Sequence, residues 1–425
     1  MEACCLILSL QVANPSAAPA ALRPYSSGGL TLGMRPDCSR ISAGRHSTRR
    51  KFAAKLCPAP HEGLEGYPCA KFPFFAKMAV MILTRRGGYE RNNLWIHPRL
   101  HAGTERSAPV GRHAGLWHSR GNCARCLNDS TAILCSLEFY RGADVDGGSI
   151  YEVGMAYAKG ARCYGYTRDK RPMAWKYQDS ILRGGVAYDR KGRPLPYADL
   201  PFSPNVVGAM KIVEGDFDDC LQVFSLDCEE RRKKSGSASG RTEAVAGETA
   251  KDGGAPVVYV AGPERYDADA QEQYKKIREW GSQLGLRIVV PTDEVRDMSE
   301  EQASDPYARA YHIFDRQQQH VRDCDILVAN LNDFHGWEPD SDTSFECGMA
   351  FQLGKKLYGY MDSTARMIDR VPSLGPEKEY RDICGCNVEN FDYPINLMFA
   401  SSMPILQGNV FDALARAAQD LPPQR

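Results

Sequence analysis

Carboxylates and small residues are combined in one segment of the chain in a way that could serve chemistry at a sugar carbon. The segment SFECGMA places Glu346 at the start of a predicted helix, directly after an acidic loop that runs from Glu338 to Asp342. The dipole at a helix N-terminus favours the ionised form of a carboxylate. An ionised carboxylate can attack an acetal-like carbon, and a second carboxyl group nearby can supply a proton. This spacing therefore predicts a nucleophile, Glu346, with a partner acid.

A plainer interpretation is that Glu346 only offsets the dipole of its own helix, as many first-turn glutamates do. The same pattern, however, occurs a second time in the chain. Glu152 stands in YEVGMA, and Asp146 precedes it by six residues, as Asp340 precedes Glu346. The repetition favours a functional role over a purely local one.

The repeat extends well beyond these residues. Phe334 to Tyr360 and Tyr140 to Tyr166 share 10 identities in 27 aligned positions without a gap. An asparagine in an apolar setting follows each glutamate, Asn396 at 50 residues and Asn205 at 53 residues. A self-similarity of this length indicates an internal duplication.

The second copy has the pattern of an α/β unit. Val257 to Ala261 and Leu286 to Val290 are short apolar runs of the buried-strand type, and apolar residues at helical spacing lie between them. Asp305 followed by Pro306 predicts the N-cap and first turn of another helix, which leads to the strand Ile326 to Leu331. This alternation predicts a doubly wound parallel sheet, in which the site lies at the carboxyl ends of the strands.

The first copy lacks a convincing opening half, because no strand and turn like YVAGP precede it at the expected distance. KMAVMILT, ending at Thr84, is compatible with a strand, but no amphipathic helix follows it. We therefore interpret the first copy as partial or degenerate. The expected organisation is a basic head (1–126), a partial repeat (127–228), a flexible Gly- and Ser-rich linker (229–256) and a complete α/β domain (257–421).

From Val257 to about Leu421 the chain resembles the nucleoside 2-deoxyribosyltransferases. The resemblance rests on YVAGP, DILVANL, PDSDTSFECGMA, GKKLYGY and INLM in this order. It implies a doubly wound fold of the flavodoxin-like or Rossmann-like kind, which the internal repeat makes a tandem duplication. It also implies transfer of 2-deoxyribose between nucleobases in nucleotide salvage, through a covalent deoxyribosyl intermediate on a glutamate and without a cofactor.

Carried over residue by residue, the resemblance makes Glu346 the nucleophile and Asp340 the residue that helps to protonate the leaving base. Tyr259 orients the nucleophile, and Gly262, Gln317 and Asn396 are the expected substrate contacts; family members usually have an aspartate where Gln317 stands. The family's asparagine reaches into a neighbouring subunit's site. The chain is thus expected to work as a homo-oligomer or as an internal pseudo-dimer, with Asn205 completing the Glu346 site.

Family members usually have a glycine where Asp342 stands, and the first copy keeps one there as Gly148. The remaining first-copy equivalents are Glu152, Asp146 and Asn205.

Composition limits the partners. The chain has 53 basic and 53 acidic residues, but residues 1–127 carry 18 basic and 6 acidic side chains, which leaves an acidic body. Such a body does not predict binding to nucleic acid or to anionic membranes.

Scattered cysteines indicate free thiols in a reducing compartment, so we expect a cytoplasmic protein, with organellar targeting by the basic head as an alternative. His113, His118, Cys123 and Cys126 match no common zinc module, and no metal site is expected.

Two other functions are compatible with the sequence. One is a hydrolase of deoxynucleosides or their 5′-phosphates, in which water takes the place of the acceptor base. The other is a nucleoside-binding protein without catalytic activity, which the degenerate first copy makes plausible.

Overall fold

The computed structural model describes residues 6–10, 80–84, 94–97, 127 and 130–422, the last range with gaps at 178–179, 185, 190–191, 193, 196, 236–253, 294–297, 377–379 and 383–384. Below, residues 130–235 are called the N-terminal unit and residues 254–422 the C-terminal unit. The elements before the C-terminal unit are β1 (Leu6–Leu10), β2 (Val80–Thr84), β3 (Leu94–His97), β4 (Ser130–Ser136), α2 (Gly147–Ala158), β5 (Arg162–Thr167), α3 (Met173–Lys176), β6 (Ile181–Arg183), β7 (Val186–Tyr188), α4 (Pro204–Ala209), β8 (Met210–Glu214) and α5 (Phe217–Ser235). Those of the C-terminal unit are β9 (Val257–Ala261), η1 (Pro263–Tyr266), α6 (Ala270–Gln283), β10 (Arg287–Val289), α7 (Glu300–Ser304), α8 (Pro306–Asp323), β11 (Ile326–Asn330), α9 (Ser341–Gln352), β12 (Lys356–Met361), α10 (Met367–Arg370), α11 (Leu397–Ala400), β13 (Ile405–Gln407) and α12 (Val410–Gln419).

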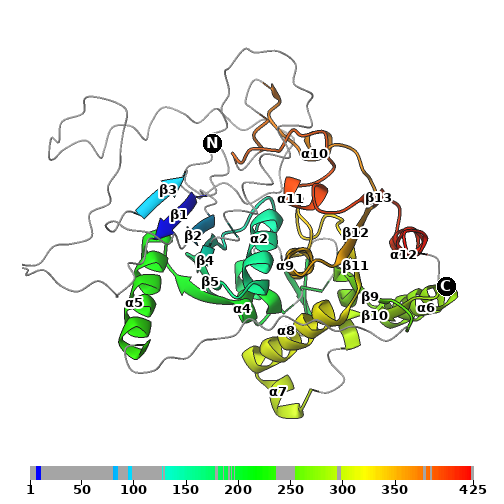
Figure 1. Ribbon diagram of the computed structural model, residues 1–425, viewed down its shortest axis with the longest axis horizontal. Helices are drawn as coiled ribbons and strands as arrows, with labels where there is room; N and C mark the ends of the chain where they lie inside the picture. Colours follow the sequence, from blue (N-terminus) through cyan, green and yellow to red (C-terminus); the bar gives the residue numbers. More distant parts are fainter. Residues whose placement is uncertain are drawn as a thin grey trace, which may run out of the picture.

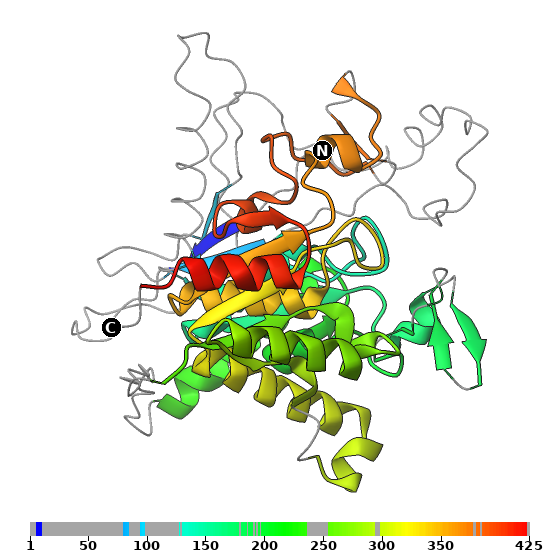
Figure 2. The same ribbon diagram turned by 90° about the vertical axis from the view of Figure 1, so that its right-hand side faces the viewer.

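The C-terminal unit is the expected parallel α/β structure. Its strands follow the order β10-β9-β11-β12-β13, and every neighbouring pair is parallel. Helices α6 and α12 cover one face of this sheet, and α8 and α9 cover the other (Figure 2). The predicted N-cap is confirmed, because the Asp305 side chain accepts a hydrogen bond from the backbone N–H of Ala308 at the start of α8.

The N-terminal unit has a mixed sheet, so the prediction of a purely parallel architecture is wrong for this part. Strands β4, β5 and β8 are parallel neighbours, but β2 lies antiparallel to β4, and the sheet order is β3-β1-β2-β4-β5-β8. The strand proposed for KMAVMILT is confirmed as β2. An antiparallel strand needs no helical crossover of the βαβ type, which agrees with the absence of an amphipathic pattern after Thr84.

The three parallel strands of the N-terminal unit pair in the same register as their counterparts in the C-terminal unit. Ala132 pairs with Arg162, and Ile326 pairs with Lys356, each residue of the second pair standing 194 positions after its counterpart. His335 and Arg141, which are separated by the same interval, both have a φ of 52°. The two units therefore share local backbone geometry as well as strand order.

Helices α2 and α9 pack against each other between the two sheets (Figure 1). Their contact is reciprocal: a Cβ atom at Gly348 would lie 1.9 Å from the carbonyl oxygen of Tyr151, and one at Gly154 would lie 2.1 Å from that of Phe345. Only glycine permits so close an approach of the two backbones. The layers therefore run from α5 through the first sheet to α2 and α9, then through the second sheet to α6 and α12.

A buried ion pair also connects the units. Arg141 of the N-terminal unit donates from Nη1 to Glu338 at 2.9 Å and from Nε to Asp382 at 3.0 Å. Nearby, Gly142 and Gly336 form a β-bridge between equivalent positions of the two units. Removing one partner of such a pair would leave an uncompensated buried charge.

The expected linker begins later than predicted. Helix α5 continues to Ser235, so its last seven residues lie inside the segment 229–256 that was assigned to the linker. Glu229 and Glu230 each stand four residues before a lysine, and basic residues fill the last turn. Both features stabilise a helix even without apolar residues.

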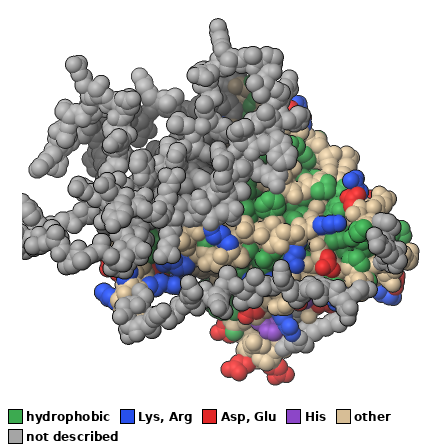
Figure 3. Space-filling model, viewed as in Figure 1, with side chains coloured by type: hydrophobic (Ala, Val, Ile, Leu, Met, Phe, Trp, Pro, Cys, Tyr) green, Lys and Arg blue, Asp and Glu red, His purple; other side chains and the backbone are tan. Residues whose placement is uncertain are grey.

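Within the described residues, no helix combines the length and apolar character that a membrane crossing would require. Cys135 and Cys347 are among the free thiols of the described residues. Acidic and basic side chains are interspersed over the face in Figure 3, with acidic ones gathered near α7.

The close contact of α2 and α9 generates a prediction about stability. Replacing Gly348 with alanine should destabilise the protein by about 1–3 kcal/mol, because the added methyl group forces the two helices apart. Urea unfolding would measure the change. Gln271→Ala on the exposed side of α6 is the control and should have little effect; a Gly348→Ala variant as stable as the wild type would contradict the packing argument.

Candidate active site

Tyr259 and Glu346 meet at the carboxyl end of the sheet. Side chains alternate along β9, so Tyr259 points to the face covered by α9, whereas Val258 and Val260 point to the face covered by α6. The Tyr259 hydroxyl donates a hydrogen bond of 2.9 Å to Oε1 of Glu346. Strand order reverses between β9 and β11, and this is the point at which open α/β sheets place their ligand sites.

Glu346 is completely buried, and its other carboxylate oxygen is not hydrogen-bonded. Oε2 has no hydrogen-bond partner among the residues that the structure describes. Burial raises the pKa of Glu346 to about 8, while Arg265 and the bond from Tyr259 act in the opposite direction. Glu346 is the sixth residue of α9, so it lies beyond the first turn, and burial opposes the ionised form that the helix N-terminus was expected to favour.

Three further charged groups surround this carboxylate. Asp340 caps α9, accepting from the backbone N–H of Thr343 at 3.0 Å and from its hydroxyl at 2.8 Å. Arg265, from the turn after β9, places Nη2 3.6 Å from Asp340 and 3.4 Å from Asp342. Burial raises the pKa of Asp342, and the nearby guanidinium opposes that rise. The site thus combines carboxylates with a buried cation that offsets part of their charge.

The N-terminal unit contributes Asn205 to this site. Its backbone N–H donates to Oδ1 of Asp342 at 2.9 Å, and its side-chain Nδ2 donates to the Asp342 carbonyl at 3.3 Å. Gln318 on α8 in turn donates to Oδ1 of Asn205 at 3.3 Å. Asn205 therefore contacts the C-terminal unit at Asp342 and Gln318, and its expected role in completing the Glu346 site stays a prediction.

Asn396 lies at the other unit. A Cβ atom at Gly148 would lie 2.8 Å from the amide atoms of Asn396, so this asparagine faces the N-terminus of α2 and not α9. It also caps α11 and donates to Glu389 at 3.0 Å. Asn396 thus faces the opposite unit, and its expected contact with a substrate stays a prediction.

The first-copy equivalents occupy matching positions in α2. Asp146 caps the helix by accepting from the backbone N–H of Ser149 at 2.6 Å, and Glu152 is buried within it. The strand beside β4 is β2, whose sequence VMILT has no tyrosine. The sequence of β2 therefore offers no tyrosine at the place that Tyr259 has in β9.

Gly262 and Gln317 are the other residues that were predicted to contact the substrate. Gly262 follows β9 at the carboxyl edge of the sheet, and Gln317 is fully buried on α8. His320, on the same helix, packs its ring 5.6 Å from that of Tyr259. Sequence reasoning missed Arg265, Gln318 and His320; a charged residue in the turn after the first strand was the available signal for Arg265.

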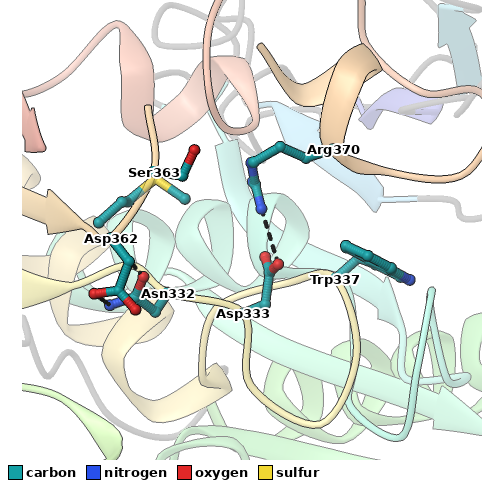
Figure 4. A pocket seen from close by; sticks show the side chains of 7 residues that line it. Asn332, Asp333, Trp337, Asp362, Ser363 and Arg370 are labelled. Atoms are coloured by element: carbon teal, nitrogen blue, oxygen red, sulfur yellow. Dashed lines mark hydrogen bonds and ion pairs between the residues drawn. The ribbon is translucent and has the colours of Figure 1, made fainter. Parts of the chain in front are cut away.

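A surface cavity of about 390 Å³ lies between the loops that follow β11 and β12 (Figure 4). Arg370 donates to Asp333 at 2.8 Å, and Asn332 donates to Asp362 at 3.4 Å, so its polar walls are largely paired with each other. None of the predicted site residues lines it. Among described residues there is no cluster of three or more potential metal ligands, and the His113 to Cys126 segment lies outside them.

Comparison with known families agrees with this geometry. Residues 258–398 match the model of the nucleoside 2-deoxyribosyltransferase family, and this range includes Tyr259, Asp340 and Glu346. This part of the chain is therefore similar to that family. The matched range contains the sheet edge, the buried glutamate and its tyrosine.

Solved structures similar to the chain include a 2-deoxyribosyltransferase from Leishmania mexicana, with 25% identity over 39% of this chain and 98% of that one and a TM-score of 0.32. A 2-deoxyribosyltransferase from Bacillus psychrosaccharolyticus has 17% identity over 37% and 95% of the two chains and a TM-score of 0.24. A CMP N-glycosidase from Clostridium botulinum has 13% identity over 39% and 99%, with a TM-score of 0.20. A comparison with curated proteins gave no match.

The buried carboxylate of Glu346 predicts a pH-dependent effect of Glu346→Gln on stability. The pKa of Glu346 is about 8 in the folded protein against 4.5 for an ordinary glutamate, so the unfolded chain loses this proton first as pH rises. The wild type should therefore lose stability between about pH 4.5 and pH 8, a loss that the glutamine variant avoids.

Thermal unfolding at pH 5 and pH 8 would measure this effect. The Tm of Glu346→Gln minus that of the wild type should be larger at pH 8. Glu230→Gln, an exposed substitution on α5, serves as the control and should show no such pH dependence. A difference for Glu346→Gln that is equal at both pH values would contradict the prediction.

Proposed function

We propose that this protein transfers 2-deoxyribose between nucleobases through a covalent intermediate on Glu346. One observation carries the proposal: Tyr259 fixes one oxygen of the buried Glu346 carboxylate, while Oε2 has no hydrogen-bond partner among the described residues. An oriented carboxylate with one uncommitted oxygen has the form required of a nucleophile toward C1′. The match of residues 258–398 to the deoxyribosyltransferase family supports the same reaction.

In the first step, Oε2 of ionised Glu346 attacks C1′ of a 2-deoxyribonucleoside, and the bond between C1′ and the base nitrogen breaks. The electron pair of that bond goes to the base, which takes a proton from Asp340. Tyr259 holds the attacking carboxylate in place and stabilises its charge before attack. The products of this step are a free base and a deoxyribosyl ester of Glu346.

In the second step, a ring nitrogen of another nucleobase attacks C1′ and displaces the Glu346 carboxylate. The proton released by the incoming base returns to Asp340. Two inversions at C1′ give net retention of configuration. All bonds and protons balance without a redox cofactor, and the two substrates are a 2-deoxyribonucleoside and a free nucleobase, as in the salvage of nucleosides.

We further propose that the two units are tandem copies that pair as an internal pseudo-dimer. Equal strand registers, the reciprocal glycine contacts of α2 and α9, and the bridge between Gly142 and Gly336 support this arrangement. Asn205 would then serve the Glu346 site from the opposite unit, while Asn396 would serve the unit that contains Glu152. Because β2, which takes the place of β9 next to β4, contains no tyrosine, we assign the transfer reaction to Glu346 alone.

The reaction itself is directly testable. Incubation of the full-length protein with a deoxynucleoside and a second free base should give the exchanged nucleoside, and Glu346→Ala should abolish the exchange. A trapped intermediate should add the mass of deoxyribose to the peptide that contains Glu346. Asp369→Asn, at an exposed position of α10, is the control.

The possible outcomes separate the three functions. Exchange supports the transferase, release of base without exchange identifies a hydrolase, and the absence of both identifies a binding protein. Labelled mass on the peptide of Glu152, or activity retained by Glu346→Ala and lost in Glu152→Gln, would overturn the assignment to Glu346.

The pseudo-dimer predicts different effects for the two asparagines. Asn205→Ala removes the hydrogen bonds to Asp342 and Gln318 and should lower the rate of transfer about tenfold, which corresponds to the loss of roughly one hydrogen bond to the site. Asn396→Ala, the matched control at the opposite unit, should lose a helix cap worth about 1 kcal/mol of stability but retain transfer.

Steady-state rates and melting temperatures of both variants would make this comparison. Loss of transfer in Asn396→Ala with normal rates in Asn205→Ala would show that the site is completed by a second chain and not by the N-terminal unit.

A further inference from the structure

Asp342 is the position at which the two units differ most clearly in chemistry. It is fully buried in α9, whereas the equivalent residue of α2 is Gly148. Both of its carboxylate oxygens are engaged. Oδ1 accepts from the backbone N–H of Asn205 at 2.9 Å, and Oδ2 accepts from Nη2 of Arg265 at 3.4 Å.

The same guanidinium nitrogen also lies close to the residue assigned as the proton donor. Nη2 of Arg265 is 3.6 Å from Oδ2 of Asp340, and the side chain of Arg265 is only 4% exposed. An arginine in direct contact with a carboxyl group favours its ionised form and so weakens it as an acid. The position of this buried cation between two carboxylates therefore matters for proton transfer to the base.

We propose that Asp342 is a positioning residue that binds Arg265 and thereby keeps Asp340 available as the proton donor to the departing base. Asn205 of the N-terminal unit holds Asp342 in place, so that the pairing of the units controls this acid. The proposal rests on the transfer reaction proposed above. It assigns no contact with the substrate to Asp342.

Other groups near Asp342 are consistent with its role in positioning Arg265. Glu346 lies about one turn further along α9. Burial, Asp342 and Asp340 raise its pKa, while the same cation, Arg265, lowers it. Ser203 from the N-terminal unit hydrogen-bonds to Ser341, beside Asp342 in α9, at 3.1 Å. Without the Asp342 carboxylate, Arg265 would turn to the remaining carboxylates of the site.

The decisive experiment compares two substrates that differ in their need for an acid. The base of 2′-deoxyadenosine needs a proton as it leaves, whereas 2-deoxyribosyl nicotinamide is a pyridinium glycoside whose base departs as a neutral molecule. Asp342→Asn should lower kcat/KM for deoxyadenosine about 10- to 100-fold, within the range expected for a weakened general acid. For the pyridinium substrate the change should remain below about threefold, because no proton is transferred.

A second set of variants tests whether Asp342 acts through Arg265, and it still gives a result if one variant folds poorly. Asp342→Gly, which introduces the residue found at position 148, should show the same selectivity as Asp342→Asn. In an Arg265→Gln background, Asp342→Asn should cause little further loss for deoxyadenosine, because its effect acts through the guanidinium. Thermal unfolding of each variant and the control Asp369→Asn establish that the compared proteins are folded.

Equal losses for both substrates, or fully additive effects of the Asp342 and Arg265 substitutions, would overturn this proposal while leaving the transfer reaction intact. A wild-type protein that acts on neither substrate would overturn the proposed function, and this proposal with it. The two failures are therefore distinguishable by the activity of the wild type.

Discussion

The burial of one carboxylate governs the chemistry of this site. Removing Glu346 from water raises its pKa to about 8, so the fold itself opposes the ionised form that a nucleophile needs. Tyr259 and Arg265 counteract this effect through a hydrogen bond and a positive charge. The resulting carboxylate lies in a position where water does not compete for its uncommitted oxygen.

The two units meet along α2 and α9. Glycines at equivalent places in these helices allow the two backbones to come into direct contact. The same contact brings Asn205 to Asp342 and Asn396 to Gly148. Each unit thus supplies an asparagine to the other, and in the C-terminal unit Tyr259 of β9 is hydrogen-bonded to the buried glutamate.

Much of the C-terminal unit was predictable because its signals are local. Apolar runs predicted β9 and β11, and Asp305 with Pro306 predicted the start of α8. The family resemblance predicted that Tyr259 orients Glu346. The mixed sheet of the N-terminal unit was not predictable in the same way, since strand direction depends on pairing with residues far away in the chain. Helix α5 extended past Cys228 because charge pairs stabilised a segment that has little apolar character.

The sequence by itself determined the alternation of strands and helices, because this alternation depends on neighbours within one or two turns. The repeat and the residue types of the site can be read directly from the sequence. The tertiary structure alone decided that desolvation outweighs the helix dipole at Glu346, that Arg265 lies between Asp340 and Asp342, and that Asn205 and not Asn396 reaches this site. These are properties of groups up to 137 residues apart along the chain, as for the bond from Asn205 to Asp342. Electrostatic and packing energies depend on distance in space, which no local pattern of residues specifies.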